Sequence, residues 1–107
     1  MLLDASGEDL PFAKVRRVVD RTALRRYHEL HPVCEVCGQA AMPTPHHLRP
    51  VSLGGPDLPH NCLSLCATHH VGRDGIHPLG PLRWCERHLH RLSYGARKKV
   101  EAAYDVS

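Results

Sequence analysis

The sequence predicts a small α+β domain of 107 residues in which helices flank a short, irregular centre. Helix-forming residues dominate both ends of the chain, whereas residues 43–59 contain five prolines and a Gly-Gly pair, which exclude a long helix there. Large apolar side chains are few, with one Phe and one Trp. The five cysteines and ten histidines, both transition-metal ligands, therefore predict that a metal ion stabilises the fold.

The first third of the chain predicts a tail followed by a helix. Residues 1–10 have the character of a loose tail, and residues 12–31 carry helix formers. Asp20 is placed to cap a helix over residues 22–30, because its carboxylate can accept an unpaired amide hydrogen of the first turn. Leu24, Tyr27 and Leu30 recur at every third position, so this helix can turn one apolar side to a core.

The rest of the chain predicts short strands and then helices. We expect two extended segments, residues 44–49 and 51–53, joined and followed by turns. A short helix should follow Cys66 and end near Asp74. Two further helices are expected over residues 81–92 and 94–104, with Pro81 in the first turn of one and Ser93 capping the other. We assign Trp84 to the core between these last two helices.

Positive charge is concentrated in two clusters, although the formal net charge is only +3. The first contains Arg16, Arg17, Arg21, Arg25 and Arg26, and the second contains Arg83, Arg87, Arg91, Arg97, Lys98 and Lys99. Such clusters suit a polyanion such as nucleic acid, bound mostly through its phosphate backbone. Two solvated helix faces are the alternative interpretation.

The sequence also predicts a cellular compartment. No segment has the basic start and apolar run of a signal peptide, and none is apolar over the roughly 18 residues that cross a bilayer. We expect a cytoplasmic protein, a monomer or weak dimer, with no membrane contact. In a reducing compartment, paired cysteines favour a metal site over a disulfide.

Two ligand pairs with the same spacing predict a structural zinc site. Cys34 and Cys37 form a CxxC pair followed by Gly38, and Cys66 and His69 form a CxxH pair. Ligands three residues apart on a tight turn can chelate one tetrahedral ion, and three cysteines with one histidine are a standard closed zinc set. We therefore expect Zn²⁺ at these four residues.

A pair of histidines lies within the loop that this zinc site would close. On a regular strand, His46 and His47 would point to opposite faces, so the strand must twist or end there if both serve one site. The segment PHHLRPVSLGGPDLPHNCLSLCATHH, residues 45–70, resembles the core of the zinc-stabilised HNH endonucleases. The matching features are the His-His pair, the Gly-Gly pair, Asn61 five residues before Cys66, and His70 after the last zinc ligand.

This resemblance implies a ββα-metal core, also called a His-Me finger, with flanking helices. It implies that the protein hydrolyses DNA phosphodiester bonds, by nicking or by double-strand cleavage. His47 would act as the general base, and Asn61 would hold the loop or the base in position. His46 and His70 would bind a catalytic Mg²⁺, Mn²⁺ or Ni²⁺ ion.

The third ligand of that ion has two candidates. Asp74 would lie one helical turn after His70, which is the reason to favour it, and His77 is the alternative. Arg49 and Arg73 are the nearest candidates for contacts to a phosphate, with ordinary surface charge as the alternative interpretation.

The whole chain is then expected to form one nuclease domain. Residues 1–31 would form a basic tail and helix, residues 32–77 the zinc-bound ββα core, and residues 78–107 the C-terminal helices. Small proteins of this kind resemble those of bacteriophages, which suggests genome processing or packaging with the phage terminase as a partner. The alternative is a non-catalytic zinc-ribbon module that binds nucleic acid.

Overall fold

The computed structural model describes residues 17–106, so the predicted tail over residues 1–10 lies outside the described residues. In order along the chain the elements are helix α1 (Arg21–Leu30), strand β2 (His46–His47), 3₁₀ helices η1 (Val51–Leu53) and η2 (Pro59–Asn61), strand β3 (Cys62–Leu63), helices α2 (Ala67–His70), α3 (Ile76–Leu79) and α4 (Pro81–His88), 3₁₀ helix η3 (Leu89–Arg91) and helix α5 (Tyr94–Tyr104). Helices and a small sheet thus coexist, which confirms the mixed α+β class.

The sheet consists of β2 paired with β3 in an antiparallel register that sets His46 opposite Leu63 and His47 opposite Cys62. The expectation of an extended segment over residues 51–53 was wrong. Those residues form η1, which ends at Gly54 in the left-handed conformation with φ of 85°. The partner of the first strand therefore comes from residues 62–63 and not from residues 51–53.

Helix α1 begins at Asp20, whose side chain accepts a hydrogen bond from the amide of Ala23, as predicted. The observed bounds, Arg21–Leu30, agree with the helix predicted over residues 22–30, and residues 17–20, although they include helix formers, are not helical. Tyr27 is buried, and its hydroxyl donates to the carbonyl oxygen of Cys62 at 3.1 Å. Leu30 is 68% exposed. Of the three residues predicted to face the core, only Tyr27 is buried and Leu24 is half-buried.

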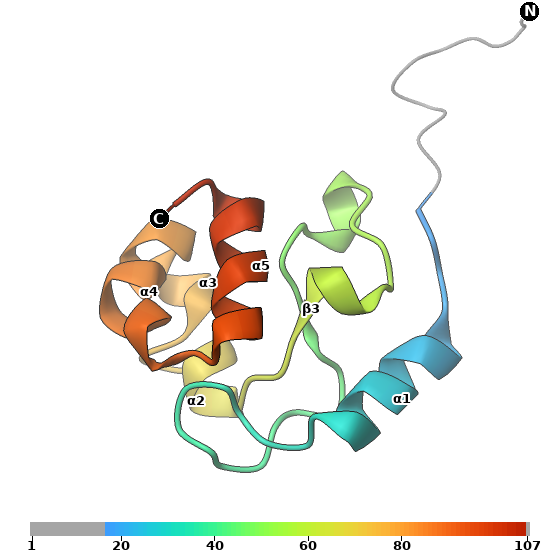
Figure 1. Ribbon diagram of the computed structural model, residues 1–107, viewed down its shortest axis with the longest axis horizontal. Coiled ribbons are helices and arrows are strands. Elements are labelled where there is room, and N and C mark those ends of the chain that lie inside the picture. The colour runs from blue at the N-terminus through green and yellow to red at the C-terminus, as the bar shows by residue number, and fades with distance from the viewer. Residues whose placement is uncertain (1–16, 107) are drawn as a thin grey trace, which may run out of the picture.

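The C-terminal helices agree closely with the sequence prediction. Pro81 occupies the first turn of α4, and Ser93 caps α5 through a hydrogen bond to the amide of Ala96. Trp84 is fully buried, and its indole nitrogen donates to the carbonyl oxygen of His69 at 3.2 Å. In Figure 1, α4 and α5 gather at one end of the molecule and α1 lies at the other, with the segment that contains β3 between them.

One lysine joins the two ends. Lys99 on α5 donates to the hydroxyl of Tyr27 at 2.9 Å and to the carbonyl oxygen of Pro59 at 3.0 Å. The hydrophobic core runs from the Cys34 turn through Leu63 on the sheet to Val100 on α5. Among residues 17–106, no helix has the length and apolar character needed to cross a membrane.

Candidate metal centres and the histidine cavity

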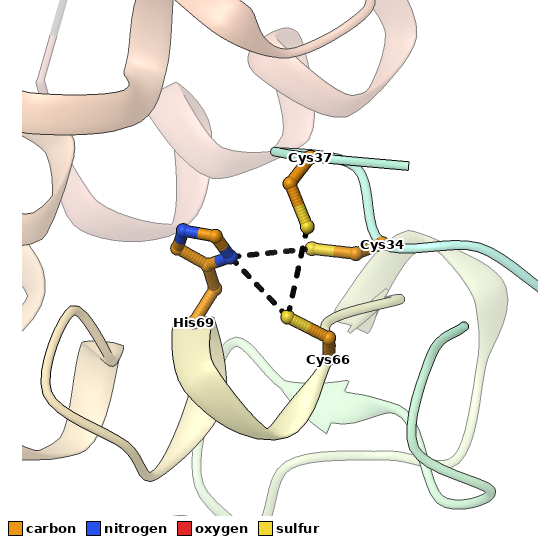
Figure 2. A group of neighbouring side chains, drawn as sticks. All are labelled: Cys34, Cys37, Cys66 and His69. Carbon is orange, nitrogen blue, oxygen red and sulfur yellow. Dashed lines mark hydrogen bonds between the residues drawn. The ribbon is translucent and has the colours of Figure 1, made fainter. Parts of the chain in front are cut away.

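Four side chains from two distant segments meet at one point, and we call them the knuckle cluster: Cys34, Cys37, Cys66 and His69. Residues 33–40 form a tight turn in which the amide of Gly38 donates to the carbonyl oxygen of Cys34 at 2.9 Å. Gly38 takes a positive φ of 77°, which closes this turn. Figure 2 shows the two cysteines of the turn facing Cys66 and His69 at the start and end of the first turn of α2.

The distances within the knuckle cluster fit a tetrahedral zinc ion. The sulfurs of Cys37 and Cys66 lie 3.7 Å apart, and Nδ1 of His69 lies 3.3 Å from the sulfur of Cys66 and 3.8 Å from that of Cys34. Ideal bonds of about 2.3 Å to sulfur and about 2.0 Å to nitrogen would set the sulfurs about 3.8 Å apart, and sulfur and nitrogen about 3.5 Å apart. The cluster can therefore hold a structural zinc ion.

The start of α2 also prepares Cys66 for metal binding. Burial disfavours its thiolate, but the backbone amide of His69 and the neighbouring thiols of Cys37 and Cys34 donate to it, and the net effect lowers the pKa of Cys66. Burial raises the pKa of Cys34 instead. Because zinc binds thiolates, the lowered pKa of Cys66 favours metal binding at the start of α2.

A second group of potential ligands, the histidine cluster, consists of His46, His70 and His77. One ring nitrogen from each lies within 4.8 Å of the other two, and the Nε2 atoms of His70 and His77 are 3.1 Å apart. Two nitrogens bound to one ion at about 2.1 Å lie roughly 3.0 to 3.4 Å apart, depending on whether the geometry is octahedral or tetrahedral. The spacing of His70 and His77 fits a shared ion.

Two members of the histidine cluster, His46 and His70, are favoured in the neutral form that binds metals. Burial, and then the neighbouring His70, His77 and His47, lower the pKa of His46 to about 3. Burial and the nearby His77 also lower the pKa of His70. The hydroxyl of Tyr104 lies 3.0 Å from Nε2 of His46, a contact of the kind that fixes the ring of a metal-binding histidine.

The expectation that Asp74 shares a helix face with His70 was wrong, because α2 ends at His70. Asp74 instead pairs with Arg87 at 3.0 Å on the surface. The chain turns back tightly at Gly75, where an added Cβ would lie 2.5 Å from the carbonyl oxygen of His70. This close approach sets α3 against α2 and brings His77 to His70, so geometry favours the alternative ligand.

His47 faces away from its neighbour, as the alternation of a strand requires. Its Nε2 lies 2.8 Å from Oδ1 of Asp57, which is 2% exposed. The same oxygen accepts a hydrogen bond from Arg17, and Oδ2 accepts the amide of Asp20 at 2.9 Å. Burial opposes ionisation of Asp57, but these three donors outweigh it and lower its pKa to about 2.

Asn61 spans the loop that joins the two strands. Its Oδ1 accepts the amide of Arg49 at 2.8 Å, and its Nδ2 donates to the carbonyl oxygens of Arg49 and Pro56, both at 3.1 Å. At Gly55 an added Cβ would collide with the backbone of Arg49, at 1.8 Å from its carbonyl oxygen. Asn61 and Gly55 together hold the loop closed, and the side chain of Asn61 forms no hydrogen bond with the ring of His47, which is bonded to Asp57.

His47 and the histidine cluster line one cavity of about 670 Å³, whose walls include Met42, Val51 and Tyr104. The two predicted phosphate contacts are not in it. Arg49 donates to the carbonyl oxygen of Leu53 and faces a different groove, beside Lys99. Arg73 is exposed in the turn after α2.

Sequence reasoning missed two residues of this site, Asp57 and Tyr104. A lone carboxylate in the proline-rich loop between His47 and Asn61 was a usable signal for Asp57. Nothing local marked Tyr104, which reaches His46 from α5 across 58 positions of sequence. Comparison of the chain with protein-family models, with curated proteins and with solved structures gives no significant match.

Proposed function

We propose that this protein is a metal-dependent endonuclease of the HNH type that hydrolyses DNA phosphodiester bonds. In this proposal β2, β3 and α2 form the ββα-metal core, and the knuckle cluster holds a structural zinc. The histidine cluster binds the catalytic ion through His46, His70 and His77, and His47 is the general base.

One observation carries the proposal. A single cavity contains three imidazoles placed for a shared ion and, beside them, a fourth histidine whose ring is held by a buried carboxylate. A structural zinc site alone has no need of this second arrangement. It therefore favours catalysis over a zinc-ribbon module that only binds nucleic acid.

The contact with Asp57 prepares His47 to accept a proton. Because the pKa of Asp57 is about 2, this carboxylate is ionised at neutral pH and the proton of the shared hydrogen bond belongs to Nε2 of His47. The lone pair of Nδ1 is then available to take a proton from water. That water attacks phosphorus in line with the departing 3′ oxygen.

A bound divalent ion would stabilise the negative charge that develops on the departing oxygen. The donor set indicates which ion. Three imidazoles suit transition metals such as Ni²⁺, whereas Mg²⁺ prefers oxygen ligands. We therefore expect Ni²⁺ to support cleavage at a lower concentration than Mg²⁺.

The test is nicking of supercoiled plasmid by zinc-loaded protein, with no added metal and with Mg²⁺, Mn²⁺ or Ni²⁺. We expect relaxed circles only with added metal, and a loss of about 100-fold or more in the His47→Ala protein. The matched control is His60→Ala, because His60 is exposed on the same loop and does not line the cavity. Equal nicking by the His47→Ala and wild-type proteins would reject the mechanism.

A further inference from the structure

A second groove, of about 510 Å³, lies along α1 on the other side of His47. Its basic wall consists of Arg17, Arg21 and Arg25. His47 lines this groove and also the cavity that contains the histidine cluster. Thr44 and Val51 line both as well, so the two hollows meet at the proposed general base.

The groove carries positive charge that no residue among 17–106 neutralises through an ion pair with Arg21 or Arg25. Arg21 and Arg25 are exposed, and among residues 17–106 neither forms an ion pair. The one carboxylate in the groove is Asp57, which Arg17 and His47 already engage. Two guanidinium groups therefore remain for an anionic partner.

The spacing of these two arginines suits a phosphate backbone. They lie four residues apart on α1, which is about 6 Å along a helix axis. Adjacent phosphates on one strand of duplex DNA rise about 3.4 Å along the axis and lie about 7 Å apart in space, so each guanidinium can meet its own phosphate. Guanidinium groups also match phosphate oxygens in geometry.

The start of α1 is fixed relative to His47, which makes the groove a built surface. The amide of Asp20 donates to Asp57, and the amide of Asp57 donates to the carbonyl oxygen of Val18 at 2.8 Å. Asp57 therefore holds both the ring of His47 and the start of α1, the helix that carries Arg21 and Arg25. A strand that follows the helix is led to the general base.

We propose that the groove along α1 binds the phosphate backbone of the DNA strand on one side of the bond to be cut, through Arg21 and Arg25. The inference rests on the proposed function for the identity of the substrate. It adds a direction, since the strand approaches His47 along α1 and reaches the histidine cluster beyond it.

The experiment measures binding alone. A short fluorescein-labelled DNA duplex is titrated with protein by fluorescence anisotropy at several salt concentrations between about 50 and 200 mM, with His47→Ala in every variant to prevent cleavage. Each lost phosphate contact reduces the slope of log K against log salt by about 0.9. We expect the Arg21→Gln/Arg25→Gln protein to lose about 1.8, and Arg25→Gln alone about half of that.

The matched control is Arg26→Gln/Arg83→Gln, which removes the same charge from exposed positions outside the groove. This control should keep the salt dependence of the parent protein. The circular dichroism spectrum and the zinc content should be the same in all variants. An unchanged slope in the groove variant, or an equal fall in the control, overturns the proposal. The proposal would also be overturned if the Arg21→Gln/Arg25→Gln protein bound a polyglutamate peptide more weakly than its parent but bound DNA equally well. That result would assign the groove to an acidic protein. Because cleavage is never measured, failure of the nuclease proposal would appear separately, in the plasmid assay.

Discussion

Replacing Asp57 by Asn tests the buried carboxylate that contacts both His47 and the start of α1. Asp57 accepts three hydrogen bonds, two on Oδ1 and one on Oδ2. Asn offers one acceptor oxygen, so its amide group must face a donor and one hydrogen bond is lost. The loss leaves a buried donor unsatisfied, which costs more than the bond itself contributes.

The pKa of Asp57 sets the size of the effect. A fall from 3.8 to about 2 means that the folded state favours the ionised carboxylate. At 1.36 kcal/mol per pKa unit the difference is about 2 kcal/mol, and we expect the Asp57→Asn protein to lose about that much free energy of unfolding at pH 7. Because the pKa is lowered on folding, the contribution is present above pH 4 and is lost as the pH falls from about 4 towards 2.

The assay is urea unfolding of the zinc-loaded proteins, followed by circular dichroism from pH 7 downwards. Loss of zinc at acid pH affects both proteins alike, since their zinc ligands are identical, so the difference between them isolates Asp57. The control is Asp74→Asn, whose ion pair with Arg87 is exposed, at 38% and 53%, and should be worth less than about 1 kcal/mol. Equal stability of the Asp57→Asn and wild-type proteins, or a loss no larger than that of the control, would refute the reasoning.

Three further predictions concern the metal centres. His77→Ala should raise the Ni²⁺ concentration needed for half-maximal nicking by about 10-fold or more, whereas Asp74→Ala should leave it unchanged; the reverse result would restore Asp74 as the ligand. Cys37→Ser should reduce bound zinc, measured by atomic absorption, from one ion per chain to a small fraction, and should lower the melting temperature. The control Cys62→Ser should keep its zinc. Full zinc content in the Cys37→Ser protein would argue against zinc binding by the knuckle cluster. Gly75→Ala should weaken Ni²⁺ binding measured by calorimetry without loss of zinc, because its methyl group meets the backbone of His70; unchanged Ni²⁺ affinity would show that this approach does not place His77.

The features that the sequence predicted well are local ones. The CxxC and CxxH pairs place their ligands through the geometry of a single turn, and Asp20 and Ser93 cap helices through hydrogen bonds within three residues. The strand is only two residues long and ends at the histidine pair, as expected, and His46 lies near the ring of His70, with centroids 5.1 Å apart.

The features that the sequence did not predict depend on contacts between distant segments. Residues 51–53 carry no pattern that distinguishes a strand from a 3₁₀ turn, and the strand partner was decided by pairing with residues 62–63. The choice between Asp74 and His77 depends on where α2 ends and on the tight turn at Gly75. The spacing of residues along a helix predicts neither feature. The role of Asp57 depends on Arg17, 40 positions away.

The central claim is that His47 and a divalent ion in the histidine cluster together hydrolyse DNA. The most direct measurement is the initial rate of plasmid nicking by protein containing one zinc per chain, as Ni²⁺ is titrated, for the wild-type and His47→Ala proteins. We expect a rate that rises from zero and saturates in the wild type. At the same zinc content, the rate of the His47→Ala protein should be lower by about 100-fold or more. Nicking that is independent of added Ni²⁺, absent at every Ni²⁺ concentration, or equal in the two proteins would contradict this mechanism.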